Sequence, residues 1–213
     1  MSKILRIDSD NFESKELEPC ISILRKGGVI AYPTETVYGL GADVNSETGL
    51  SRIYKIKGRQ SDKPVSIMIS SLHQLRDLTE GIKDYVELLM NRFWPGPLTL
   101  ILNARQNIHQ GFRSKDNKIG IRYPDHKLSR ELVQLLGSPI TSTSANLSGM
   151  QPAINAGDVV NNLGDTVDLI IDSGECSYKK PSTVVDVTGS KPTLLREGAI
   201  AFSQILQCTG RFK

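Results

Sequence analysis

The sequence predicts an α/β fold: a twisted sheet of mixed parallel and antiparallel strands with flanking helices. Short apolar runs rich in Val, Ile and Thr alternate along the chain with segments whose apolar residues recur at helical spacing. The predicted strands outnumber the predicted helices, so several strand pairs must be joined without a crossover helix, and the sheet cannot be purely parallel. The 213 residues have an ordinary globular composition, with 38% hydrophobic and 23% charged residues. We therefore expect one domain over residues 1–213, with its core at about 15–205.

The first helix is predicted within residues 16–28, because Leu17, Ile21 and Leu24 follow helical spacing and two glycines stop it. It leads into a strand at 28–33. The same criteria predict the other helices at about 47–57, 71–79, 83–93, 128–137 and 157–163. They predict the other strands at 64–70, 98–104, 118–124, 138–144, 168–174, 182–187 and 192–198. Segment 173–181 is rich in small and charged residues, which predicts a mobile loop.

The charge balance limits the kinds of partner that the surface can attract. The chain carries 26 Lys and Arg against 23 Asp and Glu, a net charge of only +3, so any anion site must be local. Three cysteines without a CxxC pair suggest neither a disulfide framework nor a structural zinc site. The charged amino terminus and the lack of an apolar run near the ~20 residues of a membrane span predict no targeting segment and no membrane association. We expect a cytoplasmic protein.

The stretch "YKIKGRQSDKP" concentrates cations in a chain of nearly balanced charge: Lys55, Lys57, Arg59 and Lys63. If 47–57 is a helix, its apolar stripe of Leu50, Ile53 and Tyr54 requires a core residue at position 57, where the sequence has Lys57. This lysine could snorkel past the core or contact the helix carboxyl end, or it could reach a cavity that holds a negative charge. Arg59 follows a glycine that should end the helix, and its fork suits a phosphate or a carboxylate.

Two polar clusters follow predicted strands. In "AYPTETVYGLGAD" (31–43) the strand ends before Thr34, Glu35, Thr36 and Tyr38, and the glycine pair that follows lacks the third glycine of a dinucleotide site, so a hydroxyl-bearing turn is the simpler interpretation. In "SPITSTSANLSG" (138–149) the hydrogen-bonding side chains are Thr141, Ser142, Thr143, Ser144, Asn146 and Ser148. They could hold substrate oxygens, or equally cap a helix or build a turn.

Several enzyme classes are poorly supported by the sequence. It contains no GxSxG elbow, no HExxH spacing and no GxxxxGK[ST] loop, which argues against a serine hydrolase, a zinc enzyme and a P-loop nucleotide site. The histidines at 73, 109 and 126 have no ligand spacing and are expected to be surface or structural residues. Arg122, Ser182 and Arg196 lie at or near strand ends, and with Lys57 and Arg59 they suggest convergence on one basic cleft.

Seven segments occur in the order of known family motifs: "KGGVIAYPTETVYGLG", "IYKIKGRQSDKP", "FWPGPLTLIL", "GIRYP", "TSTSANLSG", "STVVDV" and "LLREGAI". In them the chain resembles the YrdC-like threonylcarbamoyl-AMP synthases over about residues 20–200. The family signature K-x-R…S-x-N reads here as Lys57, Arg59, Ser144 and Asn146. The family fold is a twisted, mixed α/β sheet around a large basic cavity.

The resemblance implies that L-threonine, bicarbonate or CO2 and ATP are converted to threonylcarbamoyl-AMP and pyrophosphate, the first half of N6-threonylcarbamoyladenosine synthesis at tRNA position 37. Mg²⁺ is expected to accompany ATP, without a dedicated protein metal site. The tRNA and the proteins that transfer the threonylcarbamoyl group are possible partners. By the resemblance, the catalytic set is Lys57, Arg59, Ser144 and Asn146. The ATP-binding set is Arg59, Lys63, Ser144 and Arg196, and the threonine-binding set is Thr34, Thr36, Arg122, Ser142 and Ser182.

The chain departs from the family pattern at two points. Met68 stands where many members have histidine, so a polar contact to threonine could be missing or replaced. The sequence ends at Lys213 without the additional domain of two-domain members, so we expect the single-domain form, with segment 173–181 as a candidate for closing over the nucleotide. A paralogous branch lacks the intact signature, and its retention here favours the active branch. The alternatives are a non-catalytic tRNA- or rRNA-binding protein of the same fold, and an acyl- or carbamoyl-transferring relative.

Overall fold

The computed structural model describes residues 3–58 and 64–210. The helices in these ranges are α1 (Glu18–Arg25), α2 (Glu47–Lys57), α3 (Leu72–Leu78), α4 (Asp84–Phe93), α5 (Lys127–Leu136), α6 (Ala156–Leu163) and α7 (Phe202–Thr209). Short 3-10 helices occur at η1 (Ser14–Leu17), η2 (Gln110–Phe112) and η3 (Gly164–Thr166). None of these helices is long and apolar enough to cross a membrane.

The strands form two mixed sheets rather than the one sheet expected from the sequence. The first has the order β1-β10-β2-β3-β9, with β1 (Lys3–Arg6), β2 (Ile30–Tyr32), β3 (Gly39–Gly41), β9 (Thr143–Ser144) and β10 (Leu169–Asp172). The second has the order β12-β11-β6-β7-β4-β8, with β4 (Ile67–Met68), β6 (Leu98–Ala104), β7 (Lys118–Arg122), β8 (Ile140–Thr141), β11 (Thr183–Asp186) and β12 (Thr193–Arg196). Strand β5 (Thr79–Glu80) pairs with β6 beside this path. Both sheets combine parallel and antiparallel pairs.

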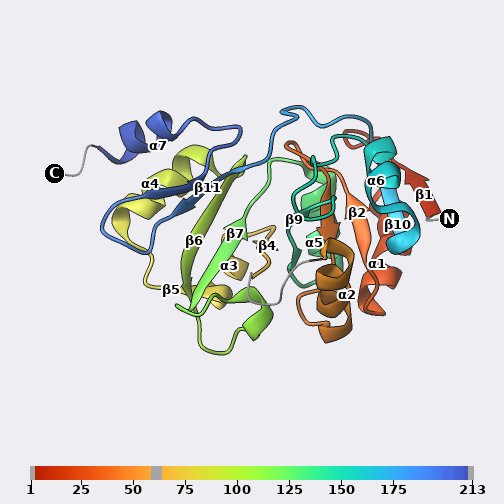
Figure 1. The fold of residues 1–213 in the computed structure, drawn as a ribbon, viewed down its shortest axis with the longest axis horizontal. Coiled ribbons are helices and arrows are strands. Elements are labelled where there is room, and N and C mark those ends of the chain that lie inside the picture. The colour runs from red at the N-terminus through yellow and green to blue at the C-terminus, as the bar shows by residue number, and fades with distance from the viewer. Residues whose placement is uncertain (1–2, 59–63, 211–213) are drawn as a thin grey trace.

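The two sheets lie side by side along the longest axis of the molecule (Figure 1). Helices α1, α2, α5 and α6 accompany the first sheet, and α3, α4 and α7 accompany the second (Figure 1). One apolar core cluster contains side chains from both sheets, such as Leu40 of β3 and Leu100 of β6. A second cluster joins β2 and β10 to helices α1 and α5. The sheet junction is therefore the part of the molecule where segments distant in sequence meet.

The predicted helices are all present, and α2 illustrates why. It begins where the Ser46 hydroxyl accepts a hydrogen bond from the Gly49 backbone N–H, and it ends at Gly58, whose positive φ of 54° is tolerated by glycine. The inner face of this helix consists of the buried side chains of Leu50, Ile53 and Ile56. The spacing and the caps are local features, so the sequence predicts the helix without its tertiary partners.

The predicted strand at 138–144 is wrong as a single element. Its first half, β8, pairs with β4 of the second sheet, and its second half, β9, pairs with β3 of the first sheet. Ser142 lies between them, and its backbone N–H donates to the Ser66 carbonyl at 2.6 Å. The chain thus crosses from one sheet to the other within the hydroxyl-rich segment.

The sequence interpretation missed β1, β3, β5 and α7, because these elements are short or lack a clear period. Strand β3 also contains the glycine pair that was assigned to a turn. A Cβ at Gly39 would lie 2.7 Å from the Tyr32 ring, and one at Gly41 would lie 3.1 Å from it. Glycine therefore allows β3 to lie against Tyr32, and this close packing explains the pair without a nucleotide loop.

Candidate functional site

A cavity of about 380 Å³ lies at the junction of the two sheets. Its wall includes the loop after β2, the start of β3, the segment before β4, strands β6 and β7, the β8–β9 crossover, residues 181–184 and Arg196 of β12. Seven predicted site residues line it: Thr34, Thr36, Arg122, Ser142, Ser144, Ser182 and Arg196. The fold therefore brings together polar groups that are spread over more than 160 positions of the sequence.

The loop after β2 is organised by two hydroxyl groups. Thr34 Oγ1 donates to the Val37 carbonyl at 2.7 Å and accepts from the backbone N–H groups of Thr36 and Val37. The Thr34 and Thr36 hydroxyls are 2.9 Å apart, and either can donate to the other. The hydroxyl of Thr34 is therefore committed within the loop.

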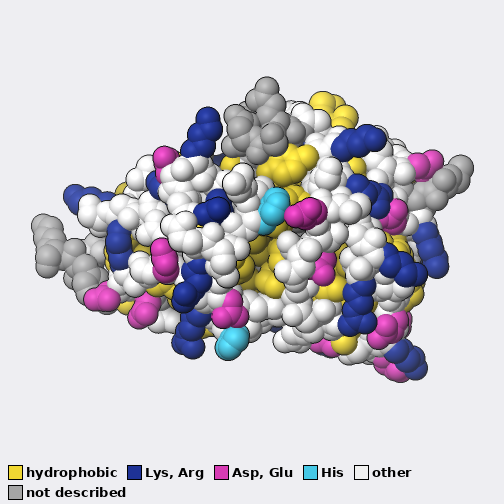
Figure 2. Space-filling model, turned by 90° about the horizontal axis from the view of Figure 1, so that it is seen from below, with side chains coloured by type: hydrophobic (Ala, Val, Ile, Leu, Met, Phe, Trp, Pro, Cys, Tyr) yellow, Lys and Arg dark blue, Asp and Glu magenta, His cyan; other side chains and the backbone are white. Residues whose placement is uncertain are grey.

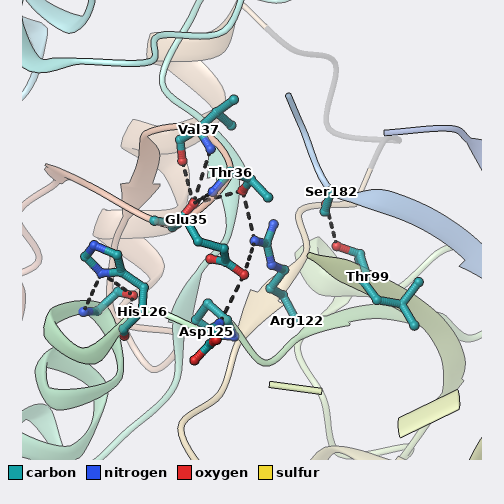
Figure 3. A network of polar contacts seen from close by, with 12 residues as sticks. Glu35, Thr36, Val37, Thr99, Arg122, Asp125, His126 and Ser182 are labelled. Atoms are coloured by element: carbon teal, nitrogen blue, oxygen red, sulfur yellow. Dashed lines mark hydrogen bonds and ion pairs between the residues drawn. The ribbon is translucent and has the colours of Figure 1, made fainter. Parts of the chain in front are cut away.

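Arg122 forms a buried ion pair with Glu35, a residue that the sequence interpretation did not assign to the site. Arg122 Nη2 lies 3.0 Å from Glu35 Oε1 and donates to Thr36 Oγ1 at 2.9 Å, as Figure 3 shows. Arg122 and Glu35 are only 5% and 6% exposed. Glu35 Oε1 also accepts the Asp125 backbone N–H at 3.0 Å. The side chain of Arg122 is thus anchored in one orientation at the cavity wall.

Arg196 occupies the cavity with a different set of partners. Its Nη2 and Nε donate to the Ser182 carbonyl at 2.9 and 3.2 Å, and the Ser182 hydroxyl lies 2.8 Å from that of Thr99. Although Arg196 as a residue is exposed, partial desolvation of its guanidinium, and next the charge of nearby Arg122, lower its pKa from the ordinary value. Arginine stays protonated in proteins, so the cavity contains two guanidinium cations. Thr99 was missed because a single threonine within a strand gives no separate sequence signal.

Lys57 and the S-x-N motif meet at Ser144, which lines the cavity. Lys57 Nζ donates to the Ser144 carbonyl at 2.6 Å and to Asn146 Oδ1 at 3.1 Å, with the Ser144 hydroxyl at 3.4 Å. Lys57 is only 4% exposed, so the snorkelling alternative is wrong. Asn146 Nδ2 donates to the carbonyls of Leu147 and Met150. Lys57 and Asn146 are not among the described residues that line the cavity. Lys57 instead contacts Ser144, which is a lining residue.

The other sequence predictions have mixed outcomes. Arg59 and Lys63 lie outside the described residues. Met68 is fully buried in the second core cluster, where a thioether needs no polar partner. Segment 173–181 is held by backbone hydrogen bonds from Cys176 to Ile154 and from Tyr178 to Glu35. Its closure over a nucleotide stays a prediction.

The histidines are structural or superficial, as predicted. His126 caps α5 by accepting the Ser129 backbone N–H, and burial lowers its pKa. His109 accepts the Gly111 backbone N–H at the start of η2, and His73 pairs with Asp77 at the surface. Within residues 3–58 and 64–210, no group of three or more His, Cys, Asp or Glu side chains is placed to hold a metal ion.

A larger groove, of about 710 Å³, lies between α2 and residues 106–117 and contains none of the predicted site residues. Its wall includes Tyr54, His109, Arg113 and Lys115 together with the acidic Glu47. On the face drawn in Figure 2, Lys and Arg side chains are interspersed with Asp and Glu side chains, without a broad area of one sign. The chemistry expected from the sequence is therefore concentrated in the smaller cavity.

Comparison with known proteins identifies the family. The model of the Sua5/YciO/YrdC family, described as "Telomere recombination", matches residues 22–198. The chain belongs to the Sua5/YciO/YrdC family. A threonylcarbamoyl-AMP synthase of Pyrococcus abyssi is 35% identical over 96% of this chain, and one of Bacillus subtilis is 38% identical over 89% of it. This Sua5/YciO/YrdC chain spans 60% and 55% of the length of those two relatives.

The three-dimensional match includes the same family. The crystal structure of P. abyssi Sua5 complexed with L-threonine aligns with a TM-score of 0.91 and 35% identity, covering 99% of this chain and 61% of that one. The mixed α/β architecture predicted from the sequence is confirmed, although its strands are divided between two sheets. The cavity described above is thus part of a fold that this chain shares with P. abyssi Sua5 over nearly its whole length.

Proposed function

We propose that this protein is a threonylcarbamoyl-AMP synthase, which forms threonylcarbamoyl-AMP and pyrophosphate from L-threonine, bicarbonate or CO2 and ATP. The observation that carries the proposal is the cavity at the sheet junction, where the buried Arg122, the more exposed Arg196 and the hydroxyls of Thr36, Ser142, Ser144 and Ser182 converge. The names of the Pyrococcus abyssi and Bacillus subtilis relatives support the same reaction. The product would pass to tRNA and a downstream transferring protein in the cytoplasm.

Threonine would bind at the Arg122 end of the cavity. A guanidinium binds a carboxylate through its N–H donors, and Arg122 lines the cavity. Thr36 accepts from Arg122 Nη2 at the cavity wall, and its hydroxyl would meet the hydroxyl or N–H of threonine. Thr34 would then shape the loop instead of contacting threonine, while Ser142 and Ser182 would complete the amino-acid site.

ATP would bind toward Ser144 and Arg196. Arg196 is anchored through the Ser182 carbonyl, and a phosphate would meet its positive charge directly. By the family resemblance, Arg59 and Lys63 would also contact the nucleotide and its phosphates. Mg²⁺ would enter with ATP as part of the substrate, because the described residues lack a cluster of protein ligands for it.

The chemistry needs cations more than it needs a nucleophilic side chain. The threonine amine takes up CO2 to give a carbamate, whose oxygen attacks the α-phosphate while the bond to the departing pyrophosphate breaks. Two anions must approach each other, and fixed positive charge in a partly dehydrated cavity lowers that barrier. Arg196 would supply this charge within the cavity, and Arg122, paired with Glu35, would hold the carboxylate of threonine. Lys57, which donates a hydrogen bond to the Ser144 carbonyl, would fix Ser144 in the cavity wall and add a further positive charge near it.

The test is pyrophosphate release by the purified protein with labelled bicarbonate, ATP and either L-threonine or L-valine. We expect release to require all three substrates and the labelled adenylate to form with threonine. Valine has a similar volume but leaves a buried hydroxyl partner unpaired, which costs about 1–3 kcal/mol and should reduce the rate about 5- to 150-fold. Equal product from both amino acids would contradict the threonine assignment, and no release with tight tRNA binding would favour the RNA-binding alternative.

A further inference from the structure

The two arginines of the cavity differ in their charge balance. Arg122 is paired with the buried carboxylate of Glu35 at 3.0 Å, so this end of the cavity holds one positive and one negative charge. Arg196 is anchored by the neutral carbonyl of Ser182, and among the described residues it has no carboxylate partner. The cavity therefore presents one compensated and one uncompensated guanidinium.

Glu35 is placed to act through Arg122 instead of touching a ligand. It is absent from the described cavity lining, which includes Arg122. In the view of Figure 3, Glu35 lies on one side of Arg122, and Thr99 and Ser182 lie on the other. Its Oε1 is fixed by the Asp125 backbone N–H, whereas its Oε2 is buried without a hydrogen-bond partner among the described residues. The carboxylate charge is thus little screened by solvent, and it lies next to Arg122, which lines the site where anions would bind.

We propose that Glu35 is a positioning and specificity-determining residue that sorts anions within the cavity. It orients Arg122 for a planar monoanion, a carboxylate, and disfavours a phosphate dianion at that end. The reason is electrostatic: the charge of Glu35 lowers the positive potential at Arg122, the attraction lost in this way is twice as large for a dianion as for a monoanion, and low solvent exposure weakens the screening. Arg196 has no such neighbour and remains suited to phosphate. The identity of the carboxylate as threonine rests on the proposed function, but the sorting of anions does not.

The experiment measures inorganic phosphate and L-threonine binding by calorimetry in wild type and Glu35→Gln. The glutamine keeps the size and the acceptor oxygen but removes the charge. We expect the ratio of phosphate affinity to threonine affinity to rise at least about tenfold, equivalent to about 1.4 kcal/mol. Asp125→Asn is the matched control, because it removes an equal charge from an exposed side chain that pairs with Arg130. Its ratio should stay within about twofold, since its charge is screened by solvent.

A purely structural Glu35 would lower stability without changing the affinity ratio, and an unchanged ratio in folded Glu35→Gln would overturn the proposal. If that variant does not fold, Glu35→Gln/Arg122→Gln replaces the pair with neutral side chains of similar shape. Because the pair is already compensated, the double variant should lose at least about tenfold in threonine affinity but keep phosphate affinity within about twofold. Equal losses for both ligands would overturn the sorting.

Failure of the proposed function gives a different result. If the wild-type protein releases no pyrophosphate but Glu35→Gln still binds phosphate about tenfold more tightly than wild type, the proposed synthase activity is refuted and the proposed role of Glu35 is retained. If the wild-type protein releases pyrophosphate but Glu35→Gln binds phosphate no more tightly than wild type, the synthase activity is retained and the proposed role of Glu35 is refuted.

Discussion

The amino group of Lys57 lies 2.6 Å from the carbonyl oxygen of Ser144, a residue 87 positions further along the chain. This contact joins the end of α2 to the β8–β9 crossover, and Asn146 adds a second acceptor at 3.1 Å. The backbone completes the link, since the Ser148 N–H donates to the Lys57 carbonyl at 3.1 Å. The K…S-x-N signature is therefore one connected unit in the folded protein.

Replacing Lys57 with methionine should reduce pyrophosphate release by about 10²-fold or more, the scale of losing one preorganised electrostatic contact. Methionine approximates the length of the lysine stem, so the loss of packing is small. The free energy of unfolding should fall by about 1–3 kcal/mol, because the acceptors on Ser144 and Asn146 are left unpaired. Initial rates and urea denaturation measure the two effects separately.

Lys55→Met is the matched control for this substitution. Lys55 lies in the same last turn of α2 but is exposed, so its loss removes an equal charge without opening the clamp. We expect near wild-type rates and stability from it. If folded Lys57→Met keeps wild-type turnover, the contact of Lys57 with Ser144 and Asn146 has no part in catalysis. If the wild-type protein has no turnover but binds tRNA, and Lys57→Met loses that binding, the RNA-binding alternative is supported.

Replacing Thr36 with valine should weaken the use of threonine selectively. The change removes the acceptor for Arg122 Nη2 and the hydroxyl partner of Thr34, and the unpaired groups cost about 1–3 kcal/mol. The KM for threonine should rise about tenfold, while the KM for ATP should change less than about threefold. Thr36→Ser retains the hydroxyl and should stay close to wild type. Equal increases in both KM values would instead indicate general damage to the cavity.

The Lys118–Asp186 pair predicts a pH-dependent part of the stability. Lys118 Nζ lies 2.8 Å from Asp186 Oδ2, and Thr188 donates two hydrogen bonds to Oδ1. Burial by itself would raise the pKa of Asp186, but the hydrogen bonds from Lys118 and Thr188 hold it below its ordinary value. The stabilisation is therefore present above the unfolded-state pKa of about 4 and is lost as the pH falls through the folded-state pKa.

Asp186→Asn should accordingly lower the free energy of unfolding by about 1 kcal/mol at pH 7, and less at pH 3. Denaturant unfolding of wild type and variant at pH 7, 5 and 3 measures this difference. Asp116→Asn, an exposed carboxylate between η2 and β7, should change stability little at any of these pH values. A difference for Asp186→Asn that does not shrink at low pH would show that lost packing, not charge, causes the destabilisation.

The sequence by itself determined most of the helices and strands and the chemical character of the site. Spacing and caps are local, so α2 could be read from Leu50, Ile53 and Gly58 without any tertiary contact. The motif resemblance also selected the polar residues, and seven of them line one cavity.

Only the tertiary structure decided how these residues act together. The division of 138–144 between two sheets depends on β4 and β3, which lie far away in the sequence. The pairing of Glu35 with Arg122, and the burial of Lys57 against Ser144, likewise join segments whose separation carries no periodic signal. Local propensity is a property of neighbouring residues, whereas strand partners and buried charge pairs are selected by the packing of the whole chain.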